Sequence, residues 1–228
     1  HIFHLGYFCK VLINIHCHQQ AHATGVLTVE NVHFGQSAPA FSPWQSVGIH
    51  PWYFQAAQLK QATAWLHDMA ARPETVAIGE AGLDKAIELT LDAQIPAFKR
   101  CAEIAETLQK PLILHCVRAY AEIIAWKKSW QPAQPWIIHG FDKHPQTAAM
   151  LLQAGCYLSF GAALLRENSR AGASLRATPP DRFFLETDAA DVEIKTIYDQ
   201  AARLRGIDPE VLEKQLENNW AQVFGPTT

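Results

Sequence analysis

Eight short apolar runs constrain the fold of this chain more than any other feature of its sequence. Most of them are almost continuously hydrophobic and rich in branched side chains, as expected for strands that are buried on both faces. They lie at residues 11–15, 25–29, 46–49, 76–79, 111–114, 136–138, 156–160 and 183–185. Runs of this kind predict a parallel sheet that is covered by helices.

Segments with the composition and period of amphipathic helices lie between most of these runs. The predicted helices are 56–71, 93–108, 120–130, 145–153, 194–205 and 209–224. Between positions 31 and 45, Gly35, Pro39 and Pro43 indicate a loop instead. Alternation of strands and helices along the whole chain predicts an α/β fold, a TIM-type (β/α) barrel. Because 228 residues fit one such barrel, we predict a single domain over residues 1–228.

The charge and the cysteines narrow the range of partners and locations. A formal net charge of −3 gives no global basic field, so any recognition of phosphate must be local. Five cysteines without close-pair spacing indicate reduced thiols and a cytoplasmic location, and we expect Cys17 and Cys116 to be buried and to point away from the site. The first residues lack the basic segment and cleavage site of a signal peptide, and no apolar run approaches the ~20 residues of a membrane span. We therefore expect no membrane partner.

Residue types that bind metals follow the predicted strands at the points where these strands end. Two histidines lie two positions apart after the first run, so that their side chains project to the same face of the strand. Loops that follow the strands of a parallel barrel share one end of it, so we expect the whole set to gather there. Imidazoles and carboxylates suit one or two divalent ions such as Zn, Mn, Fe or Mg. The predicted metal ligands are His16, His18, Glu80, His115, His139 and Asp188.

Two of these residues are also candidates for catalysis. A carboxylate such as that of Glu80 has two oxygens and can bridge two ions, which together clamp the attacking and leaving oxygens of a hydrolysis. Metal binding lowers the pKa of water toward ~7, so that a metal-bridged hydroxide forms at neutral pH. Asp188 can both hold a metal and accept a proton from the nucleophile. We therefore predict a metal-dependent hydrolase with Glu80 and Asp188 as its catalytic residues.

The strings around these ligands resemble the signature blocks of the TatD family of metal-dependent hydrolases, in the order of that family. They are Asn14-Ile-His16-Cys-His18, Val47-Gly-Ile-His50-Pro, Val76-Ala-Ile-Gly-Glu80-Ala-Gly-Leu-Asp84, Leu112-Ile-Leu-His115, Ile137-Ile-His139-Gly-Phe and Leu185-Glu-Thr-Asp188. The resemblance implies a TIM-type barrel of the amidohydrolase superfamily that cleaves phosphodiester bonds, often described as a deoxyribonuclease. It also implies two divalent ions. One would be held by His16, His18, Glu80 and Asp188, and the other by Glu80, His115 and His139.

Several positions depart from the pattern of the family. The family usually has Asp where this chain has Asn14, and often an aromatic residue where it has Lys85. The Ser-Arg-Asp-Ala string that follows the third histidine block of the family becomes Cys116-Val-Arg118-Ala, which displaces the arginine by one position. The segment between His18 and His50 is also short for the family. Asn218-Asn219-x4-Phe224 looks like its closing block, and we interpret that helix as structural.

Residues near the ligands supply candidates for contact with the substrate. We predict that His50, Lys85 and Arg118 bind it, the two cations by holding a phosphate; the alternatives are a structural histidine and solvated charges. Trp52, Tyr53 and Phe54 either wall the pocket and stack a base or pack beneath the next helix, and we adopt the packing interpretation. Glu186 is two residues before Asp188, so it is a candidate hydrogen-bond acceptor for a ligand histidine. The remaining histidines interpreted as non-ligands are His22, His33, His67 and His144.

The leading prediction is thus a metal-dependent hydrolase of phosphodiesters, possibly DNA, with no obligate protein partner. An alternative keeps the metal site and changes the bond, which gives an amidase, a lactonase or a deaminase, because a fold alone does not determine the substrate. A second alternative is a metal-binding protein with weak catalytic power. The intact ligand set argues against this last possibility.

Overall fold

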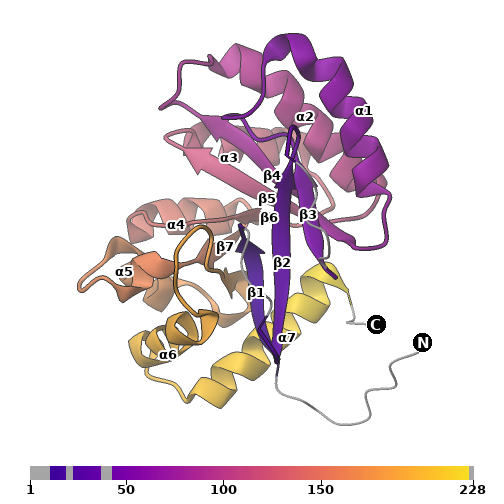
Figure 1. The fold of residues 1–228 in the computed structure, drawn as a ribbon. Helices are drawn as coiled ribbons and strands as arrows, with labels where there is room; N and C mark the ends of the chain where they lie inside the picture. The colour runs from indigo at the N-terminus through magenta and orange to yellow at the C-terminus, as the bar shows by residue number, and fades with distance from the viewer. Residues whose placement is uncertain (1–10, 19–22, 37–42, 226–228) are drawn as a thin grey trace.

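The computed structural model describes residues 11–18, 23–36 and 43–225 of the chain. Its eight strands form one sheet in which every strand pairs in parallel with the next strand along the sequence (Figure 1). The strands are β1 (Leu12–Cys17), β2 (Val26–His33), β3 (Gln45–Gly48), β4 (Thr75–Asp84), β5 (Leu112–Val117), β6 (Trp136–Ile138), β7 (Tyr157–Phe160) and β8 (Phe183–Leu185).

The sheet closes on itself where the end of β8 meets the end of β1. Cys17 and Asp188 form a parallel bridge there. The amide of Asp188 donates to the carbonyl of His16 at 3.0 Å, and the amide of His18 donates to the carbonyl of Asp188 at 3.2 Å. These bonds join the first and last strands at their carboxyl ends, which confirms the predicted TIM-type barrel.

Helices follow the strands from β3 onward. They are α1 (Leu59–Ala70), α2 (Leu91–Thr107), α3 (Tyr120–Trp130), α4 (Pro145–Gln153), α5 (Arg170–Ala177), α6 (Ile194–Arg205) and α7 (Pro209–Phe224), with 3-10 turns at Ala56–Gln58, Ala162–Leu165 and Pro180–Arg182. All six predicted helices are present. The sequence did not predict α5, because Gly172 and Ser174 break its apolar pattern although both are buried.

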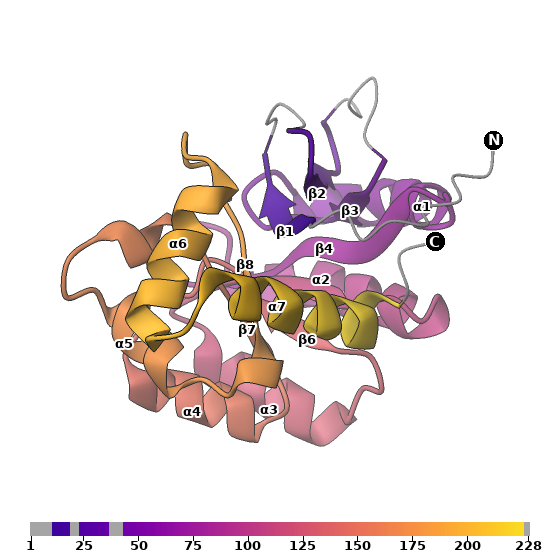
Figure 2. The same ribbon diagram turned by 90° about the horizontal axis from the view of Figure 1, so that it is seen from below.

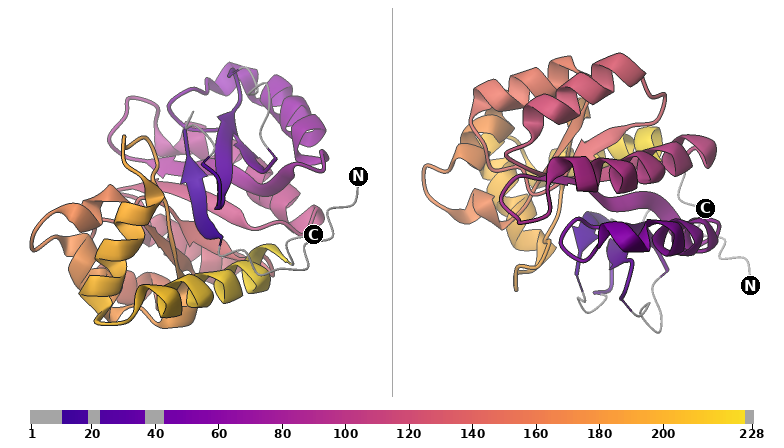
Figure 3. Two further views of the ribbon diagram at one scale, coloured as in Figure 1. Left: turned by 60° about the horizontal axis from the view of Figure 1, so that its bottom comes forward. Right: turned by 90° about the horizontal axis from the view of Figure 1, so that it is seen from above.

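The side of the barrel formed by β1 and β2 differs from the rest. The described residues between β1 and β2 and between β2 and β3 contain no helix, and the left view of Figure 3 shows both strands in front without a helix across them. The predicted loop at 31–45 was wrong at its start, because β2 continues to His33. It continues because Glu30 and Asn31, which ended the apolar run, are buried within the strand. Pro39 lies outside the described residues.

Apolar side chains form two cores, one between the strands and the helices and one inside the barrel. The inner core takes inward-facing residues from the strands and closes against α7, which crosses the starting ends of the strands when the molecule is seen from below (Figure 2). Trp220 and Val223 of α7 are both buried in it. The predicted structural role of this last helix is therefore a plug at the amino-terminal end of the barrel.

Two further predictions concern the chain as a whole. Within the described part of the chain, no helix has the length and hydrophobicity that crossing a bilayer requires. A single domain over residues 1–228 stays a prediction.

Candidate metal centre and active site

Two of the candidate ligands, His115 and His139, extend rows of side chains that point into the barrel. On β5, Ile113 belongs to the inner core and His115 follows two residues later, and Ile137 and His139 are related in the same way on β6. Because side chains two apart on a strand share a face, each row changes from apolar to ionisable as it reaches the carboxyl end. The ionisable groups are thereby gathered in one place above the inner core.

One group of ligand atoms surrounds a gap at the end of β1. The Nε2 atom of His16 lies 3.4 Å from Oε2 of Glu80 and 3.7 Å from Oδ1 of Asp188. The Nε2 atom of His18 lies 3.5 Å and 3.4 Å from the same two oxygens. Both histidines thus lie between the same two carboxylate oxygens, and the groups whose ligand atoms are close enough to hold a metal include His16 with His18 and Glu80, and His16 with His139 and Asp188.

These distances fit a divalent ion. Donors bound about 2.0–2.1 Å from a tetrahedral zinc lie about 3.3–3.4 Å from one another, close to the separations found here. His16 is fully buried, and neither of its ring nitrogens has a hydrogen-bond partner among the described residues. Buried polar atoms are normally satisfied, so an orphaned Nε2 that faces two carboxylates needs a ligand to explain it. The residues present therefore fit a metal ion.

A second group of histidines faces the other oxygen of Glu80. The Oε1 atom lies 3.0 Å from Nε2 of His50, 2.8 Å from Nδ1 of His115 and 2.7 Å from Nε2 of His139. The two oxygens of this one buried carboxylate thus separate the histidines into two groups. Such a division is what a carboxylate that bridges two ions requires.

Carboxylates lie on the far side of the His115 and His139 rings, at hydrogen-bond distance from His115 and at ion-pair distance from His139. His115 donates from Nε2 to Oδ2 of Asp84 at 2.9 Å, which leaves its Nδ1 lone pair toward Glu80. Glu186 lies 3.4 Å from Nδ1 of His139 and is anchored by the amide of Gly140 at 2.6 Å. Both contacts leave the nitrogen that faces Glu80 able to bind a metal. Glu186 thus lies beside the ring that it was predicted to contact, but the described residues show no hydrogen bond between the two.

His50 differs from these two rings. Its Nδ1 accepts a hydrogen bond from the amide of Trp52 at 3.0 Å, so a neutral ring carries its proton on Nε2, which points at Glu80. Its ligand atoms lie close enough to those of Glu80 and His115 to be considered for a metal site. The proton on Nε2 argues against this role, because a metal ligand needs a lone pair there. His50 is instead placed to donate a hydrogen bond.

The sequence reasoning missed Asp84 and Asn31. Asp84 is buried in β4 on the same face as Glu80, but the predicted strand ended at Gly79; a strand continued by the period of two would have found it. Asn31, predicted in a loop, lies in β2, and its Oδ1 accepts from the amide of Glu80 at 2.7 Å. It also accepts from the hydroxyl of Ser46 at 3.2 Å. No pattern in the sequence indicates that contact.

Asn14, the departure from the family pattern, bonds to the end of β8. Its side chain donates to Oγ1 of Thr187 at 2.8 Å and accepts from the amide of Thr187 at 3.0 Å. Because Asp188 is the next residue, this amide pair ties the strand that carries His16 to the turn that carries Asp188.

Glycines let the backbones approach each other beneath the site. A Cβ atom on Gly48, two residues before His50, would lie 2.3 Å from the carbonyl oxygen of Glu80. A Cβ atom on Gly82 would lie 1.9 Å from the carbonyl oxygen of His115. Both contacts are far shorter than a real Cβ makes, which explains why the sequence requires glycine at these two places.

Neighbouring groups within the site shift the pKa values of its two carboxylates and of His18. Burial opposes ionisation of Asp188, but its hydrogen bond with His18 and the nearby His139 and His16 lower its pKa to about 2. Hydrogen bonds to Asp188 and Glu80 raise the pKa of His18 to about 9. Although burial opposes it, the surrounding histidines hold the pKa of Glu80 well below its usual value. Both carboxylates are therefore charged at neutral pH, as metal ligands must be.

The two predicted phosphate cations have different surroundings. Both follow neighbouring strands, since the amide of Lys85 bonds to the carbonyl of Val117, next to Arg118. Lys85 forms an ion pair with Glu122. Arg118 is exposed, and no ion pair joins it to any described residue. Of the two, only Arg118 has its charge available for a substrate.

The aromatic residues after His50 do not all pack as predicted. Phe54 is buried beneath the helix as expected, but Trp52 and Tyr53 are 56% and 52% exposed, so the packing interpretation was wrong for both. The indole nitrogen of Trp52 donates to Oδ2 of Asp84 at 2.7 Å. Tyr53 stacks on His33, with ring centroids 4.0 Å apart.

Several histidines and cysteines were not predicted to be metal ligands. His33, His67 and His144 belong to no group of possible metal ligands there. Cys116 packs in the outer core, and burial raises the pKa of its thiol to about 12. Cys17 is fully buried. The predicted non-ligand His22 and Cys9 lie outside the described residues.

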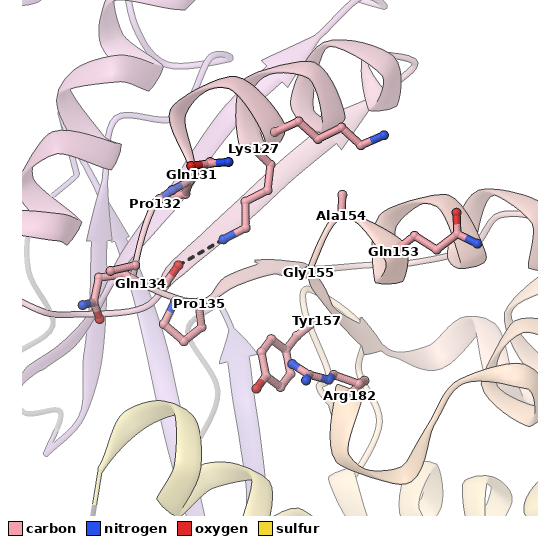
Figure 4. A pocket seen from close by; sticks show the side chains of 12 residues that line it. Lys127, Gln131, Pro132, Gln134, Pro135, Gln153, Ala154, Gly155, Tyr157 and Arg182 are labelled. Carbon is pink, nitrogen blue, oxygen red and sulfur yellow. Dashed lines mark hydrogen bonds between the residues drawn. The ribbon is translucent and has the colours of Figure 1, made fainter.

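A cavity of about 620 Å³ lies at the other end of the barrel (Figure 4). It is lined by segments that precede β6, β7 and β8, including Gln134, Gly155 and Arg182. Lys127 donates to the carbonyl of Gln134 at 3.2 Å, and the guanidinium of Arg182 lies over the ring of Tyr157 at 5.1 Å. None of the six predicted metal ligands lines it.

Comparisons with known proteins agree with this geometry. A family model described as TatD related DNase matches residues 17–225. The chain belongs to this family. The predicted family and enzyme class, a hydrolase of phosphodiester bonds, are thereby confirmed.

Individual relatives in the TatD family extend the same conclusion. A 3'-5' ssDNA/RNA exonuclease TatD from Edwardsiella piscicida is 31% identical over 220 residues, which cover 86% of this chain and 83% of the relative. Two solved structures share the fold. A TatD homolog from Escherichia coli K12 has a TM-score of 0.78 at 20% identity and covers 96% of this chain and 99% of its own. A hydrolase of the TatD family from Entamoeba histolytica has a TM-score of 0.76 at 14% identity with the same coverage.

Proposed function

We propose that this protein is a divalent-metal-dependent nuclease that removes nucleotides from the 3' end of single-stranded DNA or RNA. The observation that carries the proposal is His16, a fully buried imidazole without a hydrogen-bond partner among the described residues, facing two carboxylates at 3.4–3.7 Å. The Edwardsiella relative is a 3'-5' ssDNA/RNA exonuclease by name, and this name supplies the direction and the substrate of the proposal.

We infer two ions of Zn, Mn or Mg. His16, His18, Glu80 and Asp188 would hold one, and Glu80, His115 and His139 the other. The division of the histidines between the two oxygens of Glu80 supports this assignment. When bound, such ions lower the pKa of water and neutralise the charge that develops on a phosphate.

The residues of the chain contribute binding and proton transfer. Asp188 is 42% exposed in its side chain and reaches solvent at the mouth of the site, where it accepts a proton from the attacking water. His50 donates a hydrogen bond from Nε2 to Glu80 and contacts the substrate with its ring, and Arg118 holds the phosphate by its guanidinium fork. Glu80 binds the ions and holds one group of histidines at each of its two oxygens. Asp84 and Glu186 hold two of the rings in orientation.

An end-labelled oligonucleotide tests the proposal. Purified protein loaded in turn with Zn, Mn or Mg is given a single strand labelled at its 5' end, with an amide and a lactone as parallel substrates. Shortening of the labelled strand in single-nucleotide steps, abolished by EDTA and restored by metal, is the expected result. Turnover of only the amide or the lactone would replace the nuclease with the alternative amidohydrolase. A strand labelled at its 3' end separates the two directions, because a 3'-5' enzyme releases that label in the first step.

We also infer a cytoplasmic location. Cys101, Cys116 and Cys156 are buried thiols without disulfides, as expected for a protein that folds in a reducing compartment.

A further inference from the structure

Two exposed aromatic residues stand at the carboxyl-terminal rim of the barrel. Trp52 and Tyr53 follow β3 directly after His50 and are more than half exposed. Within the described part of the chain, they are the only large aromatic side chains with that exposure. Leaving such area in water forgoes hydrophobic stabilisation, so a pair of this kind beside an active site indicates a ligand surface.

Trp52 is held in place although it is exposed. Its Nε1 donates to Asp84 at 2.7 Å, and its ring meets those of His50 and His115 edge to face, at 5.2 Å and 5.4 Å between centroids. The indole therefore has its polar atom satisfied and its orientation determined. A ring immobilised in this way loses little conformational entropy when it binds a flat partner.

Tyr53 extends this surface away from the metal centre. It stacks on His33 at an interplanar angle of 14° and lies 5.2 Å from His50. His50 lies 3.0 Å from Glu80, so one imidazole separates each exposed ring from the carboxylate at the centre of the site. A phosphate bound at the proposed metal centre would therefore lie next to these rings.

The charge of the site argues for stacking over purely ionic attraction. The chain has a net charge of −3, and Lys85 at the same rim is neutralised by Glu122. Arg118 is then the only one of the two predicted phosphate cations with an available charge, and bases can add affinity because their flat faces stack on aromatic rings whatever the sequence.

We propose that Trp52, extended by Tyr53, forms a stacking site for the nucleobase next to the cleaved phosphate. The proposal rests on the nuclease function proposed above and deepens it. It predicts that the enzyme distinguishes nucleic acid from other phosphodiesters by a base and cleaves single strands with little sequence preference.

An oligonucleotide that lacks the bases of its terminal nucleotides separates stacking from every other contact. On an ordinary single strand, Trp52→Leu should raise KM roughly 5- to 100-fold, the range expected for loss of one base–aromatic stack. The parent should show a similar rise when it is given the abasic strand. On that strand, Trp52→Leu should add less than a further 2-fold, because the contact is already gone.

Two more variants keep the result interpretable. Trp52→Phe keeps a ring but not the bond to Asp84, and it should retain most of the affinity. Among the described residues, Tyr53 has no hydrogen bond to Asp84 or His115. Tyr53→Leu should therefore give a smaller rise in KM, and this rise should also disappear on the abasic strand. Metal content is measured in every sample.

Equal rises in KM on the ordinary and abasic strands for both leucine variants would overturn the stacking site. If the metal-loaded parent cleaves neither strand, the nuclease proposal itself has failed, and the two failures are thereby distinguished.

Discussion

The two ends of the barrel differ in how their polar groups are satisfied. At the carboxyl-terminal end, His16 is buried with both ring nitrogens unsatisfied within the described chain, and Glu80 is buried among histidines. At the amino-terminal end, the buried cation of the 620 Å³ cavity, Lys127, already has partners. The ammonium of Lys127 meets the carbonyl of Gln134 and lies 5.1 Å from the ring centroid of Trp136.

The difference shows that the volume of a cavity is a poor guide to the active site of this protein. The 620 Å³ cavity lies where a carbonyl and aromatic rings contact Lys127 and Arg182, whereas the carboxyl-terminal end retains a buried imidazole that only a ligand completes. Unsatisfied burial is costly, so a fold retains it only where it serves a function. The predictions that follow test the contrast between the ends, from the largest effect to the smallest.

The largest effect is expected for Asp188→Asn. The amide keeps the shape of the side chain and an oxygen ligand but cannot accept a proton, so kcat should fall by about 10²–10⁴. The fold should persist, because the residue lies outside the apolar core at a strand end. Activity and bound metal are measured in the same sample. Asp199→Asn, an exposed carboxylate on α6, is the matched control. A fully loaded variant with near-parental kcat would remove Asp188 as the base and shift attention to Glu80.

Loss of a ligand histidine should change the metal content. His115→Ala and His139→Ala should each remove one ion and leave the other, because both residues serve only the second position in the proposed assignment. Elemental analysis under conditions in which the parent holds two ions measures this, and His67→Ala is the matched control. Two ions retained in both variants would contradict the two-metal arrangement.

A smaller effect is expected for the cations at the rim. Arg118→Ala should raise KM for a single strand by about 3- to 10-fold, because an exposed guanidinium without an ion pair can hold a phosphate. Lys85→Ala should change KM less, since its charge is already engaged by Glu122. Kinetics of Arg118→Ala that match the parent would show that this side chain is solvated surface.

The ion pairs at the carboxyl-terminal end also make the metal-free protein sensitive to pH. The folded-state pKa of His18, about 9, lies above its ordinary 6.5, so its contribution to stability is complete below pH 6.5 and is lost as the pH rises through 9. In EDTA, the Tm should therefore fall by about 2–4 °C between pH 6.5 and 9.5. His18→Gln should flatten this dependence. An equal slope in the variant would assign the effect to other groups.

The smallest effect is expected at the amino-terminal end. Lys127→Met keeps the apolar stem and removes the charge, so it should leave kcat and KM within about 2-fold of the parent. The cation–π contact with Trp136 contributes roughly 0.5–2 kcal/mol, so denaturant unfolding should detect a loss no greater than that. A large loss of nuclease activity would mean that the two ends of the barrel are functionally linked, which would contradict the difference between them.

Much of the site was predictable because its signals are local. Apolar runs and helical periods predicted eight strands and six helices, and the ionisable residues just beyond the runs predicted which side chains meet at one end. The period of two along a strand is sufficient to place His16 with His18, or His115 above Ile113.

The predictions failed where polar residues lie inside elements. β2 and β4 continue through buried polar residues that ended the apolar runs, so Asn31 was predicted in a loop and Asp84 was not recognised as part of the site. The family pattern likewise could not show that Asn14 ties the ends of β1 and β8 together.

The sequence by itself thus determined the barrel, its family and the six residues that gather at its carboxyl end, because each depends on short-range patterns and strand direction. Only the tertiary structure decided how the two oxygens of Glu80 divide the histidines, which nitrogen of His50 carries the proton, and that Trp52 stands exposed above Asp84. The amide of Trp52 sets the tautomer of His50 from two positions away, whereas the other features depend on contacts between residues about 30 to 60 positions apart, such as Trp52 with Asp84, Glu80 with His115 and Glu80 with His139. Strand register and the hydrogen bonds of neighbouring rings set such contacts, and neither is encoded in any local period of the chain.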